Sequence, residues 1–301
     1  MNKNLIVIGG PTGIGKTDLS IRLATAMNSE IISADSRQFY KELNIGVAKP
    51  DAQQLKKVKH HFINHLSIHQ YYSVGEYEKE ALILIKKLFK KYDTLFLCGG
   101  SGLYIDSITE GLHKFPKIST TIQKKLQDDL KEKGLQYLNQ ELKSIDLETY
   151  KIIDKKNPRR VMRALEIYRT TKIPYSQYKK SRKKARNFKT IFLCLIKNRE
   201  TLYNNINTRV DTMIQNGLLE EVESLYNYRH LQALQTIGYK EIFEYIEKKR
   251  NLEDAILEVK KNTRRYAKRQ INWFNNIKYQ HFTMNQEDQI LEYIQKATGN
   301  T

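Results

Sequence analysis

Short apolar runs alternate with amphipathic segments along the first hundred residues. The runs at 5–8, 30–34 and 94–98 have the length of strands, and the segments 16–27 and 74–92 carry apolar residues at helical spacing. Strands that alternate with helices are typical of a parallel sheet with both faces covered. We therefore predict an α/β core in this part of the chain.

From about Lys114 the pattern changes to helices alone. Apolar residues recur three and four positions apart in the segments 119–133, 134–144 and 158–171. A strand-like apolar run returns at 190–196, and helical patterns follow it. We therefore predict one α/β core, residues 1–112 and 187–301, that is interrupted by an all-helical insertion, residues 113–186.

The chain is strongly basic, and most of the excess lies in the predicted insertion. It has 52 Lys and Arg against 33 Asp and Glu, a net charge of +19. Residues 113–186 hold 21 of the basic and 8 of the acidic residues. A basic excess can serve solubility alone, but this one is concentrated, contains tyrosines and ends in the charged run 179–184. We interpret the insertion as a module that faces RNA.

The composition, 40% apolar and 28% charged over 301 residues, is that of a soluble globular protein. No apolar run approaches the roughly 18 residues of a membrane-spanning helix. The run 5–8 is also too short for the core of a signal peptide. We expect a cytoplasmic, monomeric protein without membrane contact. Cys98 and Cys194 each lie in an apolar run, so we expect two core thiols and no disulfide.

A phosphate-binding motif follows the first predicted strand and precedes the first predicted helix. It fits the pattern G-x-x-x-x-G-K-[ST] with Gly10, Pro11, Thr12, Gly13, Ile14, Gly15, Lys16 and Thr17. Glycines let successive backbone amides point at phosphate oxygens, the lysine neutralises a phosphate, and Thr17 can ligate Mg²⁺. The loop indicates a diphosphate or triphosphate ligand, and it does not specify a nucleotide.

Asp35 ends the second predicted strand and is followed by Ser36, Arg37 and Gln38. A carboxylate at this edge of a parallel sheet lies where α/β proteins bind ligands. It could hold a metal ion, as in an ordinary NTPase, or act as a general base. The pattern alone leaves both roles open.

Ordered motifs run through almost the whole chain. Besides the phosphate loop they are 32–38, 45–50, 60–61, 99–104, 157–166, 237–241, 262–270 and 273–274. Together they resemble the bacterial tRNA dimethylallyltransferases from end to end. The resemblance implies a P-loop NTPase-like α/β fold, a dimethylallyl diphosphate donor, Mg²⁺, and tRNA as the acceptor.

The resemblance also assigns roles to single residues. It implies that Asp35 removes the proton from N6 of the adenine next to the anticodon (position 37) while that nitrogen attacks the donor, and that Ser101 stands at the reacting groups. It implies that the loop and Arg209 bind the diphosphate. The positions that match tRNA contacts are Asp35, Ser36, Arg37, Gln38, Ser101, Gln123, Arg159, Arg160, Val161, Met162, Arg163, Gln235, Thr236, Ile237, Gly238, Tyr239 and Lys240.

This chain departs from the family at several positions. Gly13 and Ile14 replace the usual alanine and hydroxyl residue of the loop, and Ser101 replaces a threonine. Val47 stands where threonine is common, and Asn64 where aspartate is common. The changes at Gly13, Ile14 and Val47 leave open whether the altered site prefers a five-carbon donor.

Two further patterns are a group of spaced histidines and the stripes of the C-terminal helix. His61, His65 and His69 are spaced by four, which suggests a metal site, but the surrounding sequence is not helically patterned and would scatter the rings. In the C-terminal helix we expect an apolar stripe of Leu252, Ile256, Val259, Tyr266 and Trp273, and a basic stripe of Lys261, Arg264, Arg265 and Lys268.

Two other functions share part of this pattern. An isopentenyltransferase that acts on free AMP would have the loop and the aspartate, but it would not need the basic insertion. A kinase or an RNA-binding ATPase would have the loop, and it would transfer or hydrolyse a nucleotide phosphate.

Overall fold

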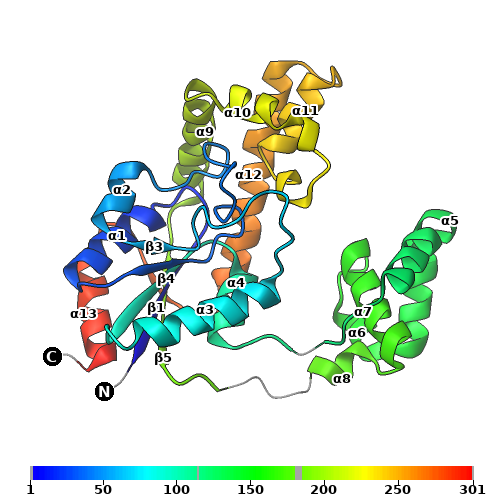
Figure 1. The fold of residues 1–301 in the computed structure, drawn as a ribbon, viewed down its shortest axis with the longest axis horizontal. Coiled ribbons are helices and arrows are strands. Elements are labelled where there is room, and N and C mark those ends of the chain that lie inside the picture. Colours follow the sequence, from blue (N-terminus) through cyan, green and yellow to red (C-terminus); the bar gives the residue numbers. More distant parts are fainter. Residues whose placement is uncertain (1–2, 114, 180–184, 300–301) are drawn as a thin grey trace. The chain divides into compact units, whose positions relative to one another are not determined.

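The computed structural model describes residues 3–113, 115–179 and 185–299 (Figure 1). In chain order the elements are β1 (Asn4–Gly9), α1 (Lys16–Ala26), β2 (Ile31–Ser33), α2 (Ala52–Lys57), β3 (His60–His61), α3 (Val74–Leu88), β4 (Thr94–Cys98), α4 (Gly102–Thr109), α5 (Thr120–Ile145), α6 (Leu147–Ile152), α7 (Pro158–Thr171), α8 (Tyr175–Lys179), β5 (Lys189–Leu195), α9 (Arg199–Gln215), α10 (Leu218–Ser224), the 3₁₀ turns η1 (Tyr226–Tyr228) and η2 (Gln232–Leu234), α11 (Tyr239–Ile246), α12 (Leu252–Phe274), β6 (Gln280–Phe282) and α13 (Glu287–Thr298).

Six strands of the described chain form one parallel sheet in the order β3-β2-β4-β1-β5-β6. β1 is an inner strand, with Asn4 opposite Thr94 of β4 on one side and Lys189 of β5 on the other. The carboxyl ends of parallel strands share one edge of the sheet, so the loops that follow β1, β2 and β4 gather there.

The four predicted strands are confirmed as β1, β2, β4 and β5. The sequence reading missed β3 and β6, which have two and three residues. Strands this short show no alternation that could separate them from a loop. They extend the sheet at its two edges.

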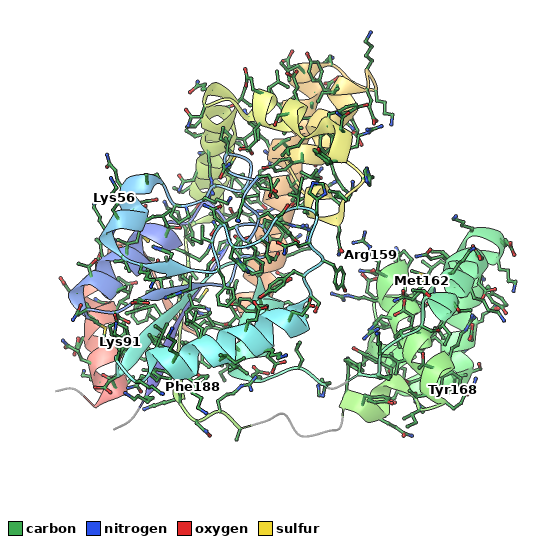
Figure 2. All side chains as sticks on the ribbon, in the orientation of Figure 1. Lys56, Lys91, Arg159, Met162, Tyr168 and Phe188 are labelled. Carbon is green, nitrogen blue, oxygen red and sulfur yellow. The ribbon has the colours of Figure 1, made fainter. Side chains whose placement is uncertain are left out.

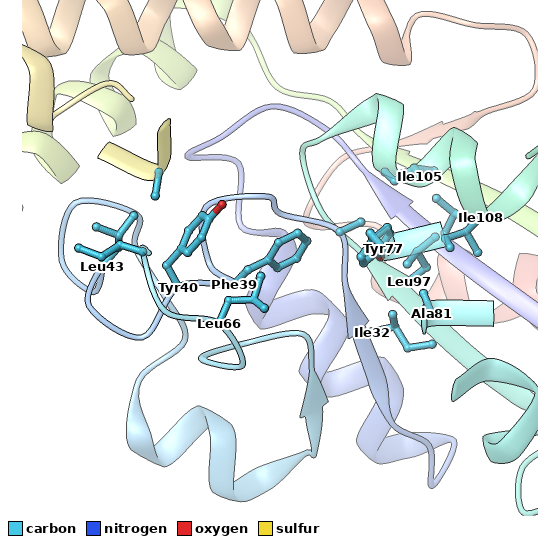
Figure 3. Packing of buried hydrophobic residues seen from close by; sticks show 14 of the residues in the cluster. Ile32, Phe39, Tyr40, Leu43, Leu66, Tyr77, Ala81, Leu97, Ile105 and Ile108 are labelled. Carbon is cyan, nitrogen blue, oxygen red and sulfur yellow. The ribbon is translucent and has the colours of Figure 1, made fainter. Parts of the chain in front are cut away.

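The sheet is buried on both faces because side chains alternate along each strand. Leu5 and Val7 pack with residues of α3 and α4, whereas Ile6 and Ile8 pack with residues of α1 and α13. Figure 3 shows the first of these layers, in which Ile32 and Leu97 of the sheet meet side chains of both helices and the loop after β2.

The chain divides into two compact units, residues 1–109 with 186–301 and residues 110–185. These bounds lie close to the predicted ones. Arg186 belongs to the first unit, because its guanidinium donates to the carbonyls of Ser107 at 2.6 Å and Ile108 at 2.7 Å and pairs with Glu78 at 2.7 Å. These bonds hold the point where the chain leaves the first unit, after residue 109, next to the point where it returns, at residue 186.

The second unit is helical, as predicted, and it has its own small core. The residues buried in it are Leu126, Leu138, Leu142, Val161, Ala164 and Leu165. Arg169 bridges Asp129 at 2.8 Å and Glu141 at 2.6 Å across this bundle. The predicted break between two helices at residue 134 is confirmed, because Gly134 has φ 78° and ψ 172° within α5. Figure 2 labels Arg159, Met162 and Tyr168 on α7 of this unit.

The apolar stripe predicted for α12 is only partly right. The residues that α12 buries are Ala255, Val259, Ala267, Gln270 and Phe274. Leu252, Ile256 and Tyr266 are half-buried, and Trp273 is 42% exposed. Gln270 can occupy an interior position because it has hydrogen-bond partners inside the protein. The predicted basic stripe is exposed except at Arg264, which donates to Asn207 at 2.7 Å.

Candidate active site

The phosphate loop joins β1 to α1 in the shape that its glycines allow. Gly13 has φ 79°, and Gly15 has φ 102° at the first position before α1. Residues with a Cβ rarely adopt this left-handed backbone, so both positions favour glycine. Ile14 is buried in the core cluster below the sheet, which accounts for an apolar residue where the family has a hydroxyl. The loop thus directs the N-terminus of α1 toward the edge of the sheet.

Two cations converge on this loop. Lys16 donates from Nζ to the carbonyl of Pro11 at 2.8 Å, and Arg209 of α9 donates from Nη1 to Oγ1 of Thr12 at 3.4 Å. Burial lowers the pKa of Lys16 and of Arg209, and the negative charge of Asp35 opposes that shift for both groups. Partly dehydrated cations bind an anion more strongly than hydrated ones. The site therefore favours a ligand that brings negative charge.

Asp35 lies beyond the end of β2 and lines the same cleft as Lys16, Thr17 and Arg209. Its Oδ1 accepts the backbone N–H of Arg37 at 3.1 Å, which fixes the carboxylate in the turn. The cleft has a volume of about 440 Å³. Its walls come from parts of the segments 12–17, 35–38, 46–48, 98–99, 206–213, 235–240 and 259–270, all in the first unit.

Ser101 is held between two residues that line the cleft. Its Oγ accepts the backbone N–H of Ser36 at 3.3 Å, and a hydrogen bond joins its hydroxyl to that of Tyr266. Burial raises the pKa of Tyr266 to about 12, and the charge of Asp35 acts in the same direction. Tyr266 therefore stays neutral at physiological pH, with a phenol that can act as a donor or an acceptor. Ser101 therefore orders the turn beside Asp35.

Gln270 is a site residue to which the sequence reading assigned no role. Its Oε1 accepts the backbone N–H of Thr12 at 2.9 Å, and its Nε2 donates to the carbonyl of Gly100 at 2.9 Å. The side chain therefore ties the loop after β1 to the loop after β4. A glutamine on the buried face of an amphipathic helix was the available signal, because buried amides need partners. Tyr266 and Arg269 also line the cleft from α12.

The segment predicted to contact tRNA before α11 lines the cleft in part. Gln235, Thr236, Ile237, Gly238 and Lys240 contribute to its wall. The side chain of Tyr239 does not, because it is fully buried and its hydroxyl donates to Glu221 at 2.6 Å. The tRNA contact expected at Tyr239 therefore falls to its backbone.

Arg37 and Gln38 line the cleft but also have partners in the protein. Arg37 donates to the carbonyls of Gln232 at 3.3 Å and Ala233 at 3.1 Å. Gln38 donates to the carbonyl of Ala48 at 3.2 Å. These bonds fix the turn after Asp35 against the segments on either side of it.

In the second unit the predicted contact residues divide by burial. Gln123, Arg159 and Arg160 are exposed, and Met162 and Arg163 are half-buried. The side chain of Val161 is fully buried in the core of the bundle, so the tRNA contact expected at this position falls to its backbone. Along α7, the residue after an exposed pair turns inward because a helix turns by about 100° per residue.

The three histidines spaced by four have separate surroundings. His61 pairs with Glu30 at 2.5 Å, His65 packs among Phe39 and other aromatic rings, and His69 packs edge-on against Tyr228. Among the residues that the structure describes, no group of three or more His, Cys, Asp or Glu side chains could hold a metal ion. Cys98 and Cys194 are free thiols, and Cys194 is buried. Within the part of the chain that the structure describes, no helix is both long enough and apolar enough to span a bilayer.

Comparison with known proteins agrees with this geometry. The chain is 49% identical over 298 residues to the tRNA dimethylallyltransferase of Christiangramia forsetii, covering 98% of each chain. It is 48% identical over 276 residues to that of Flavobacterium psychrophilum, covering 90% of each.

Solved structures give the same result. The full-length tRNA isopentenylpyrophosphate transferase of Bacillus halodurans superposes with a TM-score of 0.73 at 34% identity, covering 99% of this chain and 97% of that one. A eukaryotic dimethylallyltransferase acting on tRNA superposes with a TM-score of 0.79 at 29% identity, covering 93% of this chain and 74% of that one. The family model described as IPP transferase matches residues 38–277. This chain belongs to the IPP transferase family.

Proposed function

We propose that this protein transfers a dimethylallyl group from dimethylallyl diphosphate to N6 of the adenine next to the anticodon of tRNA. The observation that carries the proposal is one cleft that contains both a phosphate loop with two cations and the carboxylate of Asp35. Relatives that are identical to this chain at nearly half of their positions bear the name of this activity. The cleft has groups suited to a leaving diphosphate and to a reacting amine.

The diphosphate end of the donor belongs at the phosphate loop. Backbone amides at the N-terminus of α1, with Lys16 and Arg209, stabilise the charge that develops as the diphosphate leaves. Mg²⁺ takes most of its ligands from substrate phosphates and water, and the hydroxyl of Thr17 in this cleft would hold the ion together with the diphosphate. When bound, the ion would neutralise part of the diphosphate charge.

The acceptor adenine belongs at Asp35. The lone pair of an exocyclic amine is delocalised into the purine, so the amine becomes an effective nucleophile only as it loses a proton. The N6–C1 bond forms, the bond from C1 to the diphosphate oxygen breaks, and the N6 proton passes to the carboxylate of Asp35. To reach this carboxylate the adenine must leave the stack of the anticodon loop.

The helical second unit supplies a surface for the rest of the tRNA. It contains most of the basic excess of the chain, and Arg159 and Arg160 are exposed at the start of α7. The tRNA stem offers phosphates and shape more than readable sequence. This surface therefore binds through phosphate contacts, and its binding weakens as salt increases.

One incubation separates this function from its rivals. The protein is mixed with labelled dimethylallyl diphosphate and Mg²⁺, together with unmodified tRNA, with AMP, or with neither. Transfer of label to tRNA alone supports the proposal. Transfer to AMP would identify a free-nucleotide isopentenyltransferase, and ATP hydrolysis in a parallel reaction without donor would identify an ATPase; either result overturns the proposal.

A further inference from the structure

The face of α12 that lines the cleft continues beyond the cleft. Val259, Thr263, Tyr266 and Gln270 line it from successive turns of the helix. Residues three and four positions apart lie on one face of a helix, so the next residue on this face is Trp273. Trp273 thus lies one turn beyond the residues of α12 that line the cleft, close to the C-terminal end of the helix.

Trp273 lies against the loop that contains Ser101. A methyl group placed on Gly102 would come within 2.2 Å of Nε1 of the indole, so a residue with a side chain at that position would displace the ring. Gly100 meets Gln270 in the same way, at 2.1 Å. Three residues of α12 therefore contact the three consecutive residues 100–102, which lead from β4 into α4. This packing fixes the position of the indole.

Core packing does not account for Trp273, because 42% of its surface is exposed. Arg269, one turn earlier on the same side of α12, lines the cleft and is exposed. Leu103, the next residue after Gly102, is 48% exposed. An exposed aromatic ring beside an arginine is the arrangement with which proteins bind single-stranded nucleic acid, through stacking on the ring and charge on the backbone.

We infer that Trp273 is a stacking platform for an unpaired nucleobase of the anticodon loop next to the target adenine. The inference rests on the proposed function, since it presumes that tRNA enters this cleft. The target base must leave its stack to reach Asp35, which removes a stacking partner from its neighbours in the loop. The indole at the rim replaces that partner for a neighbouring base.

The sequence contains one tryptophan, so fluorescence excited at wavelengths that tyrosine does not absorb reports on Trp273 alone. We would titrate the full chain with an RNA hairpin that carries the anticodon stem and loop. Stacking predicts quenching that saturates with RNA, and the quenching is lost when one loop nucleotide beside the target is abasic. Quenching by dimethylallyl diphosphate without RNA would assign the indole to the donor and overturn the inference. Quenching that no abasic substitution removes would overturn it as well.

Substitutions test the same contact through catalysis. Trp273→Phe keeps an aromatic face, whereas Trp273→Leu keeps apolar surface without one. We expect Trp273→Leu to raise the Kd for the hairpin by about 5- to 150-fold, the range measured for a lost stacked base, and to raise the KM for tRNA more than it lowers kcat. Trp273→Phe should recover most of that loss. The KM for dimethylallyl diphosphate should stay unchanged.

Ile277→Ala is the matched control, because Ile277 lies just after α12 and is 103% exposed. Its Kd should equal that of the unaltered protein. Equal effects of Trp273→Leu and Trp273→Phe, or no effect of either, would overturn the stacking role, provided that circular dichroism shows native helix content. If the unaltered protein transfers no dimethylallyl group to tRNA, the proposed function is wrong. If the unaltered protein does so and the Trp273 variants bind the hairpin normally, only the stacking role is wrong.

Discussion

Glu221 of α10 holds the segment that forms one wall of the cleft. Its Oε2 accepts the backbone N–H groups of Asn44 at 3.1 Å and Ile45 at 2.8 Å. Its Oε1 accepts the N–H of Gly46 at 3.1 Å and the hydroxyl of Tyr239 at 2.6 Å. All four partners are hydrogen-bond donors. The substitution Glu221→Gln would therefore place a donating NH₂ group against donors, which the same substitution at an exposed glutamate would not do.

The cost of Glu221→Gln follows from these contacts. An amide has one oxygen, so two of the four donors would face an NH₂ group that cannot accept a hydrogen bond. Each hydrogen bond lost from a charged acceptor costs about 1.5–3 kcal/mol, less where water can replace it. Glu221 is partly buried, so we expect a total loss of about 2–4 kcal/mol in the free energy of unfolding of the first unit.

Denaturation by urea, followed through the fluorescence of Trp273, measures this loss in the unit to which both residues belong. Glu223→Gln on the exposed side of the same helix is the control and should change the free energy of unfolding by less than about 0.5 kcal/mol. Activity should also fall in Glu221→Gln, because residues 46–48 line the cleft. If Glu221→Gln unfolds at the same urea concentration as Glu223→Gln, the four contacts do not stabilise this segment and the reasoning is refuted.

The remaining predictions concern the site, the insertion and pH. Asp35→Asn should lower single-turnover transfer by about 10²- to 10⁴-fold with little change in tRNA affinity, and near-normal rates with saturating donor would exclude Asp35 as the base. Ser101→Ala should lower catalytic efficiency and Ser101→Thr should not, whereas a residue needed only for its small size would give the opposite order. Excision of residues 110–185 with a short bridge should leave a folded core that binds the donor but not tRNA, because Arg186 holds together the points where the chain leaves and re-enters the first unit. Binding of tRNA by the intact protein should weaken steeply as salt increases. A salt dependence equivalent to only one or two phosphate contacts would count against the insertion as the binding surface. Burial lowers the pKa of His65, so the folded protein binds this proton less readily than the unfolded chain. The stability of the protein should therefore fall as the pH drops below about 6.5. The difference between the urea midpoints at about pH 7.5 and about pH 5.5 should be smaller in His65→Phe than in the unaltered protein.

The sequence predicted those parts of the structure that depend on a strong pattern among neighbouring residues. The phosphate loop needs glycines with positive φ followed by a helix, and Gly13 and Gly15 have that backbone. The break at Gly134 was likewise visible, because a residue without a Cβ interrupts a long apolar period there. Such features depend on neighbours in the sequence, so one sequence is enough to find them.

Other features depend on contacts between distant segments and could not be read from local patterns. Gln270 meets Thr12 across 258 positions, and Glu221 meets Gly46 across 175. Tyr239 and Val161 stand in motifs that resemble RNA-contact segments, yet their side chains are buried because their own elements turn them inward. A motif identifies a segment, whereas the direction of each side chain within it is decided by the packing of the whole fold.

The position of β1 inside the sheet also has a consequence for the order of events during synthesis. Asn4 pairs with Lys189, so β1 cannot gain its second neighbour until the ribosome has made the chain between them. At about 5–20 residues per second this takes on the order of 10–40 s. The helices of residues 110–185 are synthesised within that interval and leave the ribosome before Lys189 does, and local helices form in about a microsecond. We therefore expect the inserted bundle to be folded on the ribosome before the sheet of the first unit is complete.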